Sequence, residues 1–363
     1  MFTLLFCTVI HFLVDLSGIF FMSAVMMPLA RSHTQWLAWA VLYNFMAFAV
    51  PALTGYLADR FIKKRNFLLA GIGCALIAAG YLILKGPVPS VVSVGLGNGI
   101  FHVGAGKEIL LESRGRFAPS GVFISSGALG VFLGNLWGGR FLPLWDLFTV
   151  IMILCALFLC VWEILRSRYG EKEPTRSPSG EEGDVPGDRS SMRHRAGEAF
   201  PSALLLFAVV FIRSYYGSIL KYDWKSGVVL SFVFTLCIFA GKLTGGILAD
   251  HLGLKKTIWI SLGISGITAA FSFGSPVLGC ISILFFNMTM PLTLSMLAAL
   301  MPAHQGFAFG LLMLALFLGT LPPMLMGTGW FFTSWGLPLL CFVSLAALLI
   351  VTKREGSNAS HAD

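Results

Sequence analysis

The first candidate for chemistry is an acidic side chain inside a long apolar stretch. Asp15 lies near the middle of a stretch that begins almost at Met1, and His11 precedes it by four residues. On a helix this spacing places both side chains on one face. A carboxyl group in an apolar cavity can exchange a proton as its access to water alternates, which coupling to a proton gradient requires. The pair therefore indicates a proton-coupling site. The alternative is a neutral Asp15 that hydrogen-bonds to a polar group of a neighbouring helix.

A basic side chain occupies a similar place in the second half of the chain. Arg213 lies near the middle of another apolar stretch and is followed by Tyr215 and Tyr216. A guanidinium group can hold a carboxylate or phosphate through two parallel hydrogen bonds. Arg213 could therefore bind an anionic group of a substrate, or it could form a salt bridge with Asp15. A permanent salt bridge would keep Asp15 ionised and prevent proton exchange, and the sequence leaves this conflict open.

Other polar residues within apolar stretches are candidates for a substrate cavity. His102 and Asn98 are four residues apart, and Asn287 and Thr289 interrupt an otherwise apolar stretch. A single histidine in such a place is as often a hydrogen-bonding residue between helices as a transport residue. The candidate cavity residues are Arg213, Tyr216, His102, Asn98, Tyr43, Asn44, Asn287 and Thr289.

A loop pattern, Gly-x-Leu-Ala-Asp followed by basic residues, occurs once in each half. It comprises Gly55, Asp59, Arg60 and Lys63 in the first copy and Gly246, Asp250 and Lys255 in the second. The glycine lets a neighbouring helix approach closely. The aspartate can face the positive end of another helix, which we expect near Gln305 for Asp59 and near Pro119 for Asp250. The alternative is that the loops only fix the orientation of the chain through their basic residues.

A glycine-rich pattern covers one expected helix between residues 118 and 139. Its members are Gly121, Gly130, Gly134, Asn135, Gly138 and Gly139. Glycines at this spacing share a helix face, where they permit tight packing and can form a hinge.

The elements that carry all these residues must lie in lipid. Of the 363 residues, 56% are hydrophobic and 12% are charged, and the mean hydropathy is +0.83. A membrane helix needs about 17–25 apolar residues, and strands would need the alternating pattern of a closed barrel, which is absent. The sequence therefore predicts an all-α polytopic membrane protein with twelve transmembrane helices, at 3–28, 36–57, 67–84, 88–110, 118–139, 145–165, 200–220, 227–249, 257–274, 276–300, 305–327 and 333–352.

Charge distribution and the repeated loop divide the chain into two halves. Most of the 25 Lys and Arg residues fall in alternate loops, so the formal charge of +8 reports orientation rather than a nucleic-acid partner, and both termini are expected to be cytoplasmic. Residues 166–199 are polar and predict a disordered cytoplasmic linker. We therefore expect an N-terminal six-helix half at 1–165, a C-terminal six-helix half at 200–352 and a cytoplasmic tail at 353–363.

Together these features resemble the major facilitator superfamily, whose loop signature is Gly-x-Leu-Ala-Asp-Arg-x-Gly-Arg-Lys. The first copy differs at Ile62, and the second differs at His251 and Leu254. The resemblance implies two pseudo-symmetric six-helix halves around a substrate site, with loops that latch the halves until the cytoplasmic side opens. The glycine pattern resembles the antiporter motif of the superfamily's drug exporters, which has Pro where Asn135 stands.

Residues 97–107, with Asn98 and His102, and the segment from His11 to Asp15 are similar to the fosmidomycin-resistance branch, an efflux group. The helix at 88–110 lacks the membrane arginine that typical proton-coupled drug exporters have there. We expect proton-coupled efflux of a small organic molecule. The alternatives are uptake of a small polar or anionic metabolite, with Arg213 as the anion clamp, and a non-transporting membrane sensor on the same scaffold.

The expected partners are a small-molecule substrate, protons and membrane lipid, with no nucleic acid. The sequence contains no nucleotide-binding loop and no metal-ligand pattern, so we expect no cofactor, no metal and no enzymatic activity. We expect the chain to act as a monomer in the plasma (inner) membrane.

Overall fold

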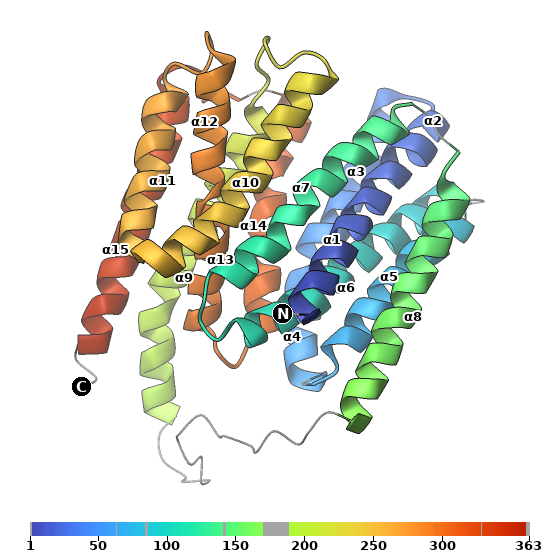
Figure 1. The fold of residues 1–363 in the computed structure, drawn as a ribbon, viewed down its shortest axis with the longest axis horizontal. Helices are drawn as coiled ribbons and strands as arrows, with labels where there is room; N and C mark the ends of the chain where they lie inside the picture. Colours follow the sequence, from blue (N-terminus) through green and yellow to red (C-terminus); the bar gives the residue numbers. More distant parts are fainter. Residues whose placement is uncertain are drawn as a thin grey trace.

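The chain forms two helical bundles side by side (Figure 1). The computed structural model describes residues 2–62, 64–83, 86–140, 143–169, 189–327 and 329–360, and no strand occurs among them. The N-terminal bundle consists of α1 (Phe2–Phe20), η1 (Phe21–Met26), α2 (Met27–Leu29), α3 (His33–Asn44), η2 (Phe45–Ala49), α4 (Pro51–Phe61), α5 (Asn66–Leu82), α6 (Pro87–Ser113), α7 (Ala118–Gly138) and α8 (Trp145–Tyr169).

The C-terminal bundle repeats this plan with fewer interruptions. It consists of α9 (Arg189–Ile219), α10 (Val228–Leu252), α11 (Leu254–Ala269), α12 (Pro276–Asn287), α13 (Thr289–Leu300), α14 (Gln305–Met326) and α15 (Gly336–Ser360). In the described part of the chain, 10 helical segments are long and apolar enough to cross a membrane, when continuous runs such as Phe2–Leu29 are counted as one. The shorter α5 and α11, of 17 and 16 residues, complete a set of twelve, which confirms the predicted all-α fold of two six-helix halves.

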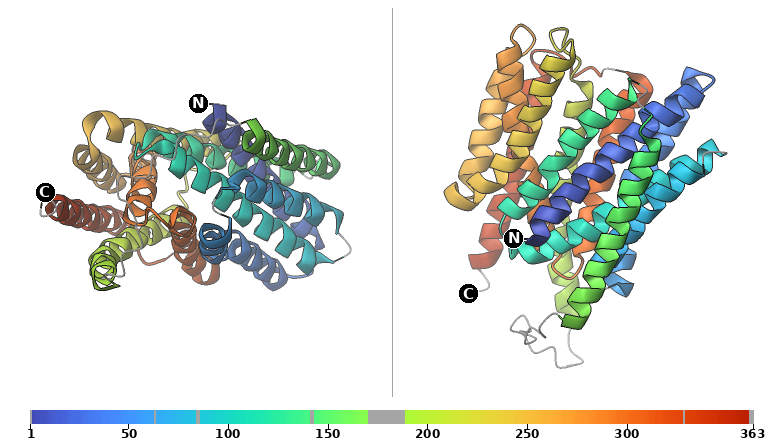
Figure 2. Two further views of the ribbon diagram at one scale, coloured as in Figure 1. Left: turned by 90° about the horizontal axis from the view of Figure 1, so that it is seen from below. Right: turned by 45° about the vertical axis from the view of Figure 1, so that its right-hand side comes forward.

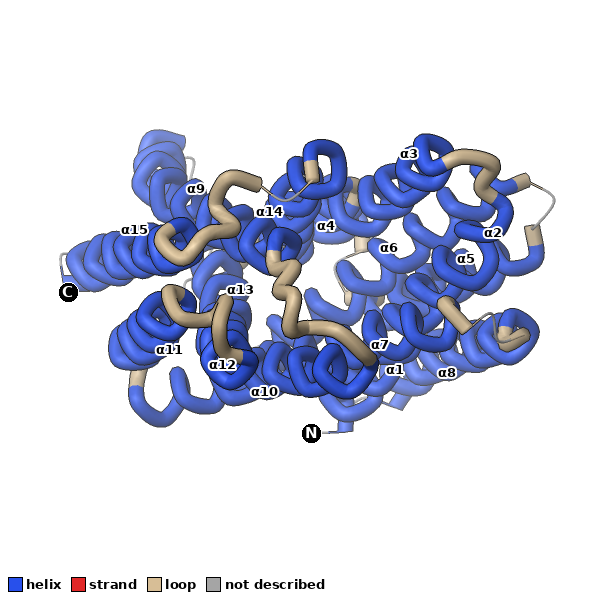
Figure 3. Tube along the Cα trace, turned by 90° about the horizontal axis from the view of Figure 1, so that it is seen from above, coloured by secondary structure: helices blue, strands red, loops and turns tan. Residues whose placement is uncertain are grey.

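The two bundles meet through matching pairs of helices. Within the N-terminal bundle α1 packs on α7, and within the C-terminal bundle α9 packs on α14. Between the bundles, α7 packs on α10 and α4 packs on α14. Seen from above, α4, α7, α10 and α14 lie between the outer helices of both halves (Figure 3). Within the halves, α1 also packs on α6, and α9 also packs on α13.

Glycines allow α7 to pack closely against the first helical rod and against α10. A Cβ atom at Gly130, Gly134 or Gly138 would collide with the backbone or Cβ atoms of the first helical rod, and one at Gly121 would meet the backbone of α10. Gly139 differs, because a Cβ atom there would approach only the carbonyl oxygen of Asn135 in its own helix. The glycine pattern therefore packs α7 against one helix from each half.

Three irregular segments interrupt the helical rods. η1 and η2 are π-helical, and in η2 the Val50 N–H donates to the Phe45 carbonyl five residues back, just before Pro51. The rod from Pro276 to Leu300 is broken at Met288, between α12 and α13, and Pro291 removes a backbone donor one turn later. Such local changes of helix type often occur at functional sites.

Both ends of the predicted linker at 166–199 are helical. α8 continues to Tyr169 and α9 begins at Arg189, because each membrane helix extends into the polar region beyond its span, while residues 170–188 lie outside the described residues. Figure 2 shows the facing ends of α8 and α9 on the same side of the molecule as the end of α15.

Candidate functional site

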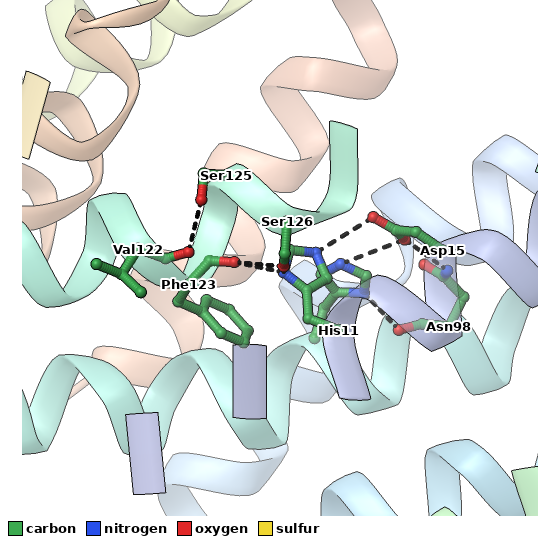
Figure 4. A network of polar contacts seen from close by, with 8 residues as sticks. His11, Asp15, Asn98, Val122, Phe123, Ser125 and Ser126 are labelled. Atoms are coloured by element: carbon green, nitrogen blue, oxygen red, sulfur yellow. Dashed lines mark hydrogen bonds and ion pairs between the residues drawn. The ribbon is translucent and has the colours of Figure 1, made fainter. Parts of the chain in front are cut away.

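Four polar side chains from two helices meet at the centre of the N-terminal bundle (Figure 4). His11 and Asp15 lie on α1, and Asn98 and His102 lie on α6, each pair at the four-residue spacing that shares a helix face. Asp15 Oδ2 is 3.2 Å from His11 Nε2, while Asp15 Oδ1 is 3.2 Å from Asn98 Nδ2 and 3.7 Å from His102 Nε2. The structure thus joins the predicted coupling pair to two of the predicted cavity residues.

The hydrogen bonds of the two Nδ1 atoms determine which ring nitrogens of His11 and His102 carry a proton. His11 Nδ1 is 2.7 Å from the Phe123 carbonyl oxygen, and His102 Nδ1 is 2.8 Å from the Asn98 carbonyl oxygen. A carbonyl oxygen only accepts, so both Nδ1 atoms must donate. In a neutral imidazole the Nε2 atom then carries a lone pair, and both Nε2 atoms face Asp15. A hydrogen bond between His11 Nε2 and Asp15 Oδ2 therefore requires one additional proton, either on the imidazole or on the carboxyl group.

The same atoms could also hold a metal ion. His11, Asp15 and His102 each offer a ligand atom, and the three atoms lie within 4.8 Å of one another. Two imidazoles whose Nδ1–H groups donate to carbonyl oxygens are oriented as metal-binding histidines commonly are. This grouping could not be expected from spacing alone, because His102 lies on α6, far along the chain from His11 and Asp15 on α1. The described geometry of the cluster thus has room for a cation between three potential ligand atoms.

α7 supports the cluster from behind. The Ser126 hydroxyl lies 3.2 Å from His11 Nδ1, and the His11 ring stacks on Phe123 with the ring centroids 4.6 Å apart. A Cβ atom at Gly127 would collide with the Asp15 carboxylate and the His11 ring. Gly127 was not among the predicted residues, although it lies in the same glycine-rich helix. Its missing side chain provides the space that the cluster occupies.

Arg213 lies on α9, at the centre of the C-terminal bundle, and is only 6% exposed. Its Nη1 donates to Thr289 Oγ1 at 3.4 Å and its Nη2 donates to Thr293 Oγ1 at 3.1 Å. Its Nε is buried and has no hydrogen-bond partner. No described carboxylate lies within ion-pair distance of Arg213, so the salt bridge with Asp15 that the sequence allowed is not formed in this conformation.

A second cation lies on α10, the helix that packs on α7 of the other half. Lys242, on α10, is half-buried, and its ammonium group interacts electrostatically with Asp15, His102 and Arg213. Within the described part of the chain it has neither a hydrogen bond nor an ion pair. Lys242 lies one turn before the loop pattern of the second half and was not among the predicted site residues.

Of the other candidate cavity residues, Asn44, Asn287 and Tyr216 hydrogen-bond within the protein, and Tyr43 is buried. The side-chain nitrogens of Asn44 and Asn287 each donate to a carbonyl oxygen one turn earlier, at 2.8 Å. Tyr43 is 3% exposed, and its ring packs against Gly18. Tyr216 is fully buried, stacks on Phe286 and exchanges a hydrogen bond with Ser282 at 2.9 Å. Tyr216 is therefore a core residue of the C-terminal bundle, because α12 covers the face of α9 on which it lies.

The loop aspartates connect the two halves at one side of the molecule. Asp59 accepts from the N–H groups of Gly306 and Phe307, at 3.0 and 2.8 Å, where α14 begins. Asp250 accepts from the N–H groups of Phe117 and Ala118, at 2.8 and 2.9 Å, where α7 begins. A Cβ atom at Gly55 or Gly246 would collide with the backbone of the same partner segments, so the glycines allow both contacts.

The remaining loop residues differ in what they contact. Arg60 is exposed and donates to Tyr56, Lys255 is exposed, and Lys63 lies outside the described residues. Sequence reasoning missed Lys107 of α6, whose Nζ lies 3.0 Å from Asp59 Oδ1 in a buried ion pair. Its neighbour Glu108 accepts from Asn66 and pairs with Arg166. A lysine at the end of an apolar stretch gave the only sequence signal for this role.

Comparisons with known proteins give a result only at the level of structure. No model of a protein family matches the sequence, and no curated protein sequence matches it either.

Several solved structures are similar over nearly the whole chain. The fucose:proton symporter FucP of E. coli is 15% identical with a TM-score of 0.61, over 97% of this chain and 98% of that one. The human organic anion transporter MFSD10 is 16% identical with a TM-score of 0.61, over 94% and 99%. A bacterial homologue of the iron transporter ferroportin, in an outward-facing state, is 17% identical with a TM-score of 0.61, over 99% and 98%. The fold is therefore that of the major facilitator superfamily of transporters.

Proposed function

We propose that the chain is a secondary transporter that moves a small molecule by alternating access, with a proton as the coupling ion. The observation that carries the proposal is the contact between His11 Nε2 and Asp15 Oδ2, which needs an additional proton because both Nδ1 atoms donate elsewhere. The Asp15 side chain is 14% exposed, so the cluster is not fully enclosed by protein. A carboxyl group in such a place can gain and lose a proton as that space opens to either side.

The contacts of Asp59 and Asp250 supply the conformational part of the proposal. Each carboxylate binds backbone N–H groups of the opposite half, and both contacts are formed together on the side where α8 ends and α9 begins. Opening that side by rocking the halves must break all four hydrogen bonds. We propose that this side is cytoplasmic and that the two loops act as latches that hold the outward-facing state.

Two directions of transport are candidates, each with its own observation. The similarity of the α7 glycine pattern to an antiporter motif favours efflux by exchange with protons, although in this structure those glycines pack α7 against its neighbours. An Arg213 that does not pair with Asp15 favours uptake of an anion together with a proton. Cells that express an exporter should accumulate less of a toxic substrate than control cells, and cells that express an importer should accumulate more.

Proton movement in proteoliposomes tests the coupling ion. Candidate compounds are added to liposomes that contain the wild type, Asp15→Asn or the exposed loop variant Arg140→Gln, and the internal pH is followed with a trapped dye. We expect substrate-dependent proton movement with the wild type and Arg140→Gln, and a loss of about a hundredfold or more with Asp15→Asn. Equal movement with Asp15→Asn, or flux of a divalent metal ion in place of protons, would show that the proton assignment is wrong.

A further inference from the structure

Arg213 is a buried cation that lacks a counter-ion. A guanidinium group stays charged and has five N–H donors, of which only two are used, both by hydroxyl groups. The Thr289 hydroxyl donates to the Phe286 carbonyl oxygen and the Thr293 hydroxyl donates to backbone carbonyl oxygens of its own helix. Both hydroxyls therefore offer lone pairs to the guanidinium and position it, but they do not neutralise it. A buried charge with polar but uncharged partners is costly unless a ligand completes it.

Lys242 adds a second positive charge to the same region. Its interaction with Arg213 is repulsive, and Asp15 lies beyond ion-pair distance of both cations. Asp15 is also occupied by His11 and Asn98. When Asp15 carries the coupling proton, the group formed by Asp15, Arg213 and Lys242 contains two cations and no anion.

We propose that Arg213 and Lys242 form the binding site for an oxyanion group, carboxylate or phosphoryl, of the transported molecule, which is therefore a small organic anion. The unpartnered Nε and one Nη of Arg213 can each donate a hydrogen bond to one oxygen of such a group, and Lys242 adds a point charge. Thr289 and Thr293 are positioning residues. The inference rests on the proposed transport function and names the substrate class of the same central site.

The charge on Asp15, in the N-terminal half, affects anion binding in the C-terminal half. An ionised Asp15 repels an anion at Arg213 and Lys242, and a proton on Asp15 removes that repulsion. Proton and anion therefore favour each other's binding, which is the requirement for moving them together. This arrangement supports the uptake direction among the two candidates.

Binding of simple anions tests the inference without knowledge of the substrate. Benzoate, phenylphosphonate and inorganic phosphate are titrated into the purified full chain at constant ionic strength, with neutral benzamide as the control, and intrinsic tryptophan fluorescence and thermal unfolding are followed. We expect at least one anion, and not benzamide, to stabilise the wild type. Its Kd should rise about ten- to hundredfold in Arg213→Gln and in Lys242→Gln, and stay unchanged in the exposed variant Arg140→Gln.

Asp15→Asn separates this inference from the proposed function. The variant removes the negative charge, so it should bind the anion as tightly as the wild type or more tightly, while proton-coupled transport is lost. Anion binding without any proton-coupled transport in the wild type would contradict the proposed function and leave the anion site intact. The anion site itself is overturned if no anion stabilises the wild type more than benzamide, or if Arg213→Gln and Lys242→Gln bind the anion as the wild type does.

Discussion

The two bundles share a fold but carry opposite charges at equivalent places. The centre of the N-terminal bundle holds one carboxylate, Asp15, beside two imidazoles whose lone pairs face it. The centre of the C-terminal bundle holds Arg213, bound only to hydroxyl groups. In each case the charge sits on the first helix of its half and is completed by the fourth, α6 or the α12–α13 rod. The difference teaches that a repeated scaffold can carry opposite charges in its two halves, and we infer a cation site in one half and an anion site in the other.

The largest expected difference is between variants of the two latch residues, Asp59 and Asp250. Asp59 has two backbone donors and a buried ion pair with Lys107, whereas Asp250 is exposed and has two backbone donors only. Asp59→Asn leaves Lys107 buried without its partner, which costs about 3–5 kcal/mol, and Asp250→Asn loses about 1–3 kcal/mol. We expect Asp59→Asn to expose the side carrying the latches to a labelling reagent far more than Asp250→Asn does.

The measurement is the labelling rate of a cysteine introduced at Ser295, which contacts Ser120 of the other half behind the latches. A double variant, Asp59→Asn with Lys107→Met, removes the unpaired charge and should recover part of the loss. Equal labelling of the Asp59 and Asp250 variants would contradict the account, because it would mean that the Lys107 ion pair adds nothing.

A glycine substitution tests how the cation site in the N-terminal bundle is built. Gly127→Ala places a methyl group against Asp15 and His11, and overpacking of this kind costs about 1–3 kcal/mol. We expect proton-coupled transport to fall by about tenfold or more. Gly139→Ala is the matched control on the same helix, because its methyl group would meet only its own helix, and it should keep wild-type transport. Similar losses in both variants would argue for a general role of α7 flexibility rather than for the cluster.

The two histidines should contribute unequally to the same site. His11 Nε2 lies 3.2 Å from the Asp15 carboxylate and His102 Nε2 lies 3.7 Å from it, beyond hydrogen-bond distance. We expect His11→Gln to reduce proton-coupled transport by about tenfold and His102→Gln by about two- to threefold. Substrate-driven proton uptake into proteoliposomes measures both. A larger effect of His102→Gln would indicate that the proton is shared with His102 on α6 rather than with His11 on α1.

Substitution of Tyr216 should have the smallest effect on transport. It tests whether Tyr216 is a core residue rather than a cavity residue. Tyr216→Phe removes a buried hydrogen bond to Ser282, which should lower the free energy of unfolding by about 1 kcal/mol. Transport and anion binding should remain at wild-type levels, since the ring is covered by Phe286. A thermal unfolding curve and an anion titration on the same sample check both statements. Loss of anion binding without loss of stability would indicate that Tyr216 lines the substrate cavity.

Sequence reasoning predicted the features that depend on local spacing. The twelve spans follow from apolar runs, and the pairing of His11 with Asp15 follows from one helical turn. The partners of Asp59 and Asp250 could be anticipated because helix N-termini near residues 118 and 306 offer free N–H groups. These inferences need only the geometry of a single helix or its ends.

The parts that escaped prediction depend on contacts between helices. His102 reaches Asp15 only because α6 packs on α1, and Gly127 acquires its role only because α1 crosses α7 at that level. The burial of Tyr216 against α12 could not be predicted, because periodicity does not show which face of α9 its neighbour covers. Lys107 and Lys242 look alike in the sequence, at the ends of apolar stretches, yet one is paired with an aspartate and the other has no ion-pair partner among the described residues.

Infrared difference spectroscopy tests the central claim, a proton held at Asp15, most directly and needs no substrate. Purified protein is moved between two pH values, and the carbonyl-stretch band of a protonated carboxyl group is followed in the wild type, Asp15→Asn and Arg213→Gln. The account predicts a pH-dependent band in the wild type and in Arg213→Gln that is absent from Asp15→Asn. The same band in Asp15→Asn as in the wild type would show that the titrating carboxyl group lies elsewhere and would contradict the division of work between the two halves.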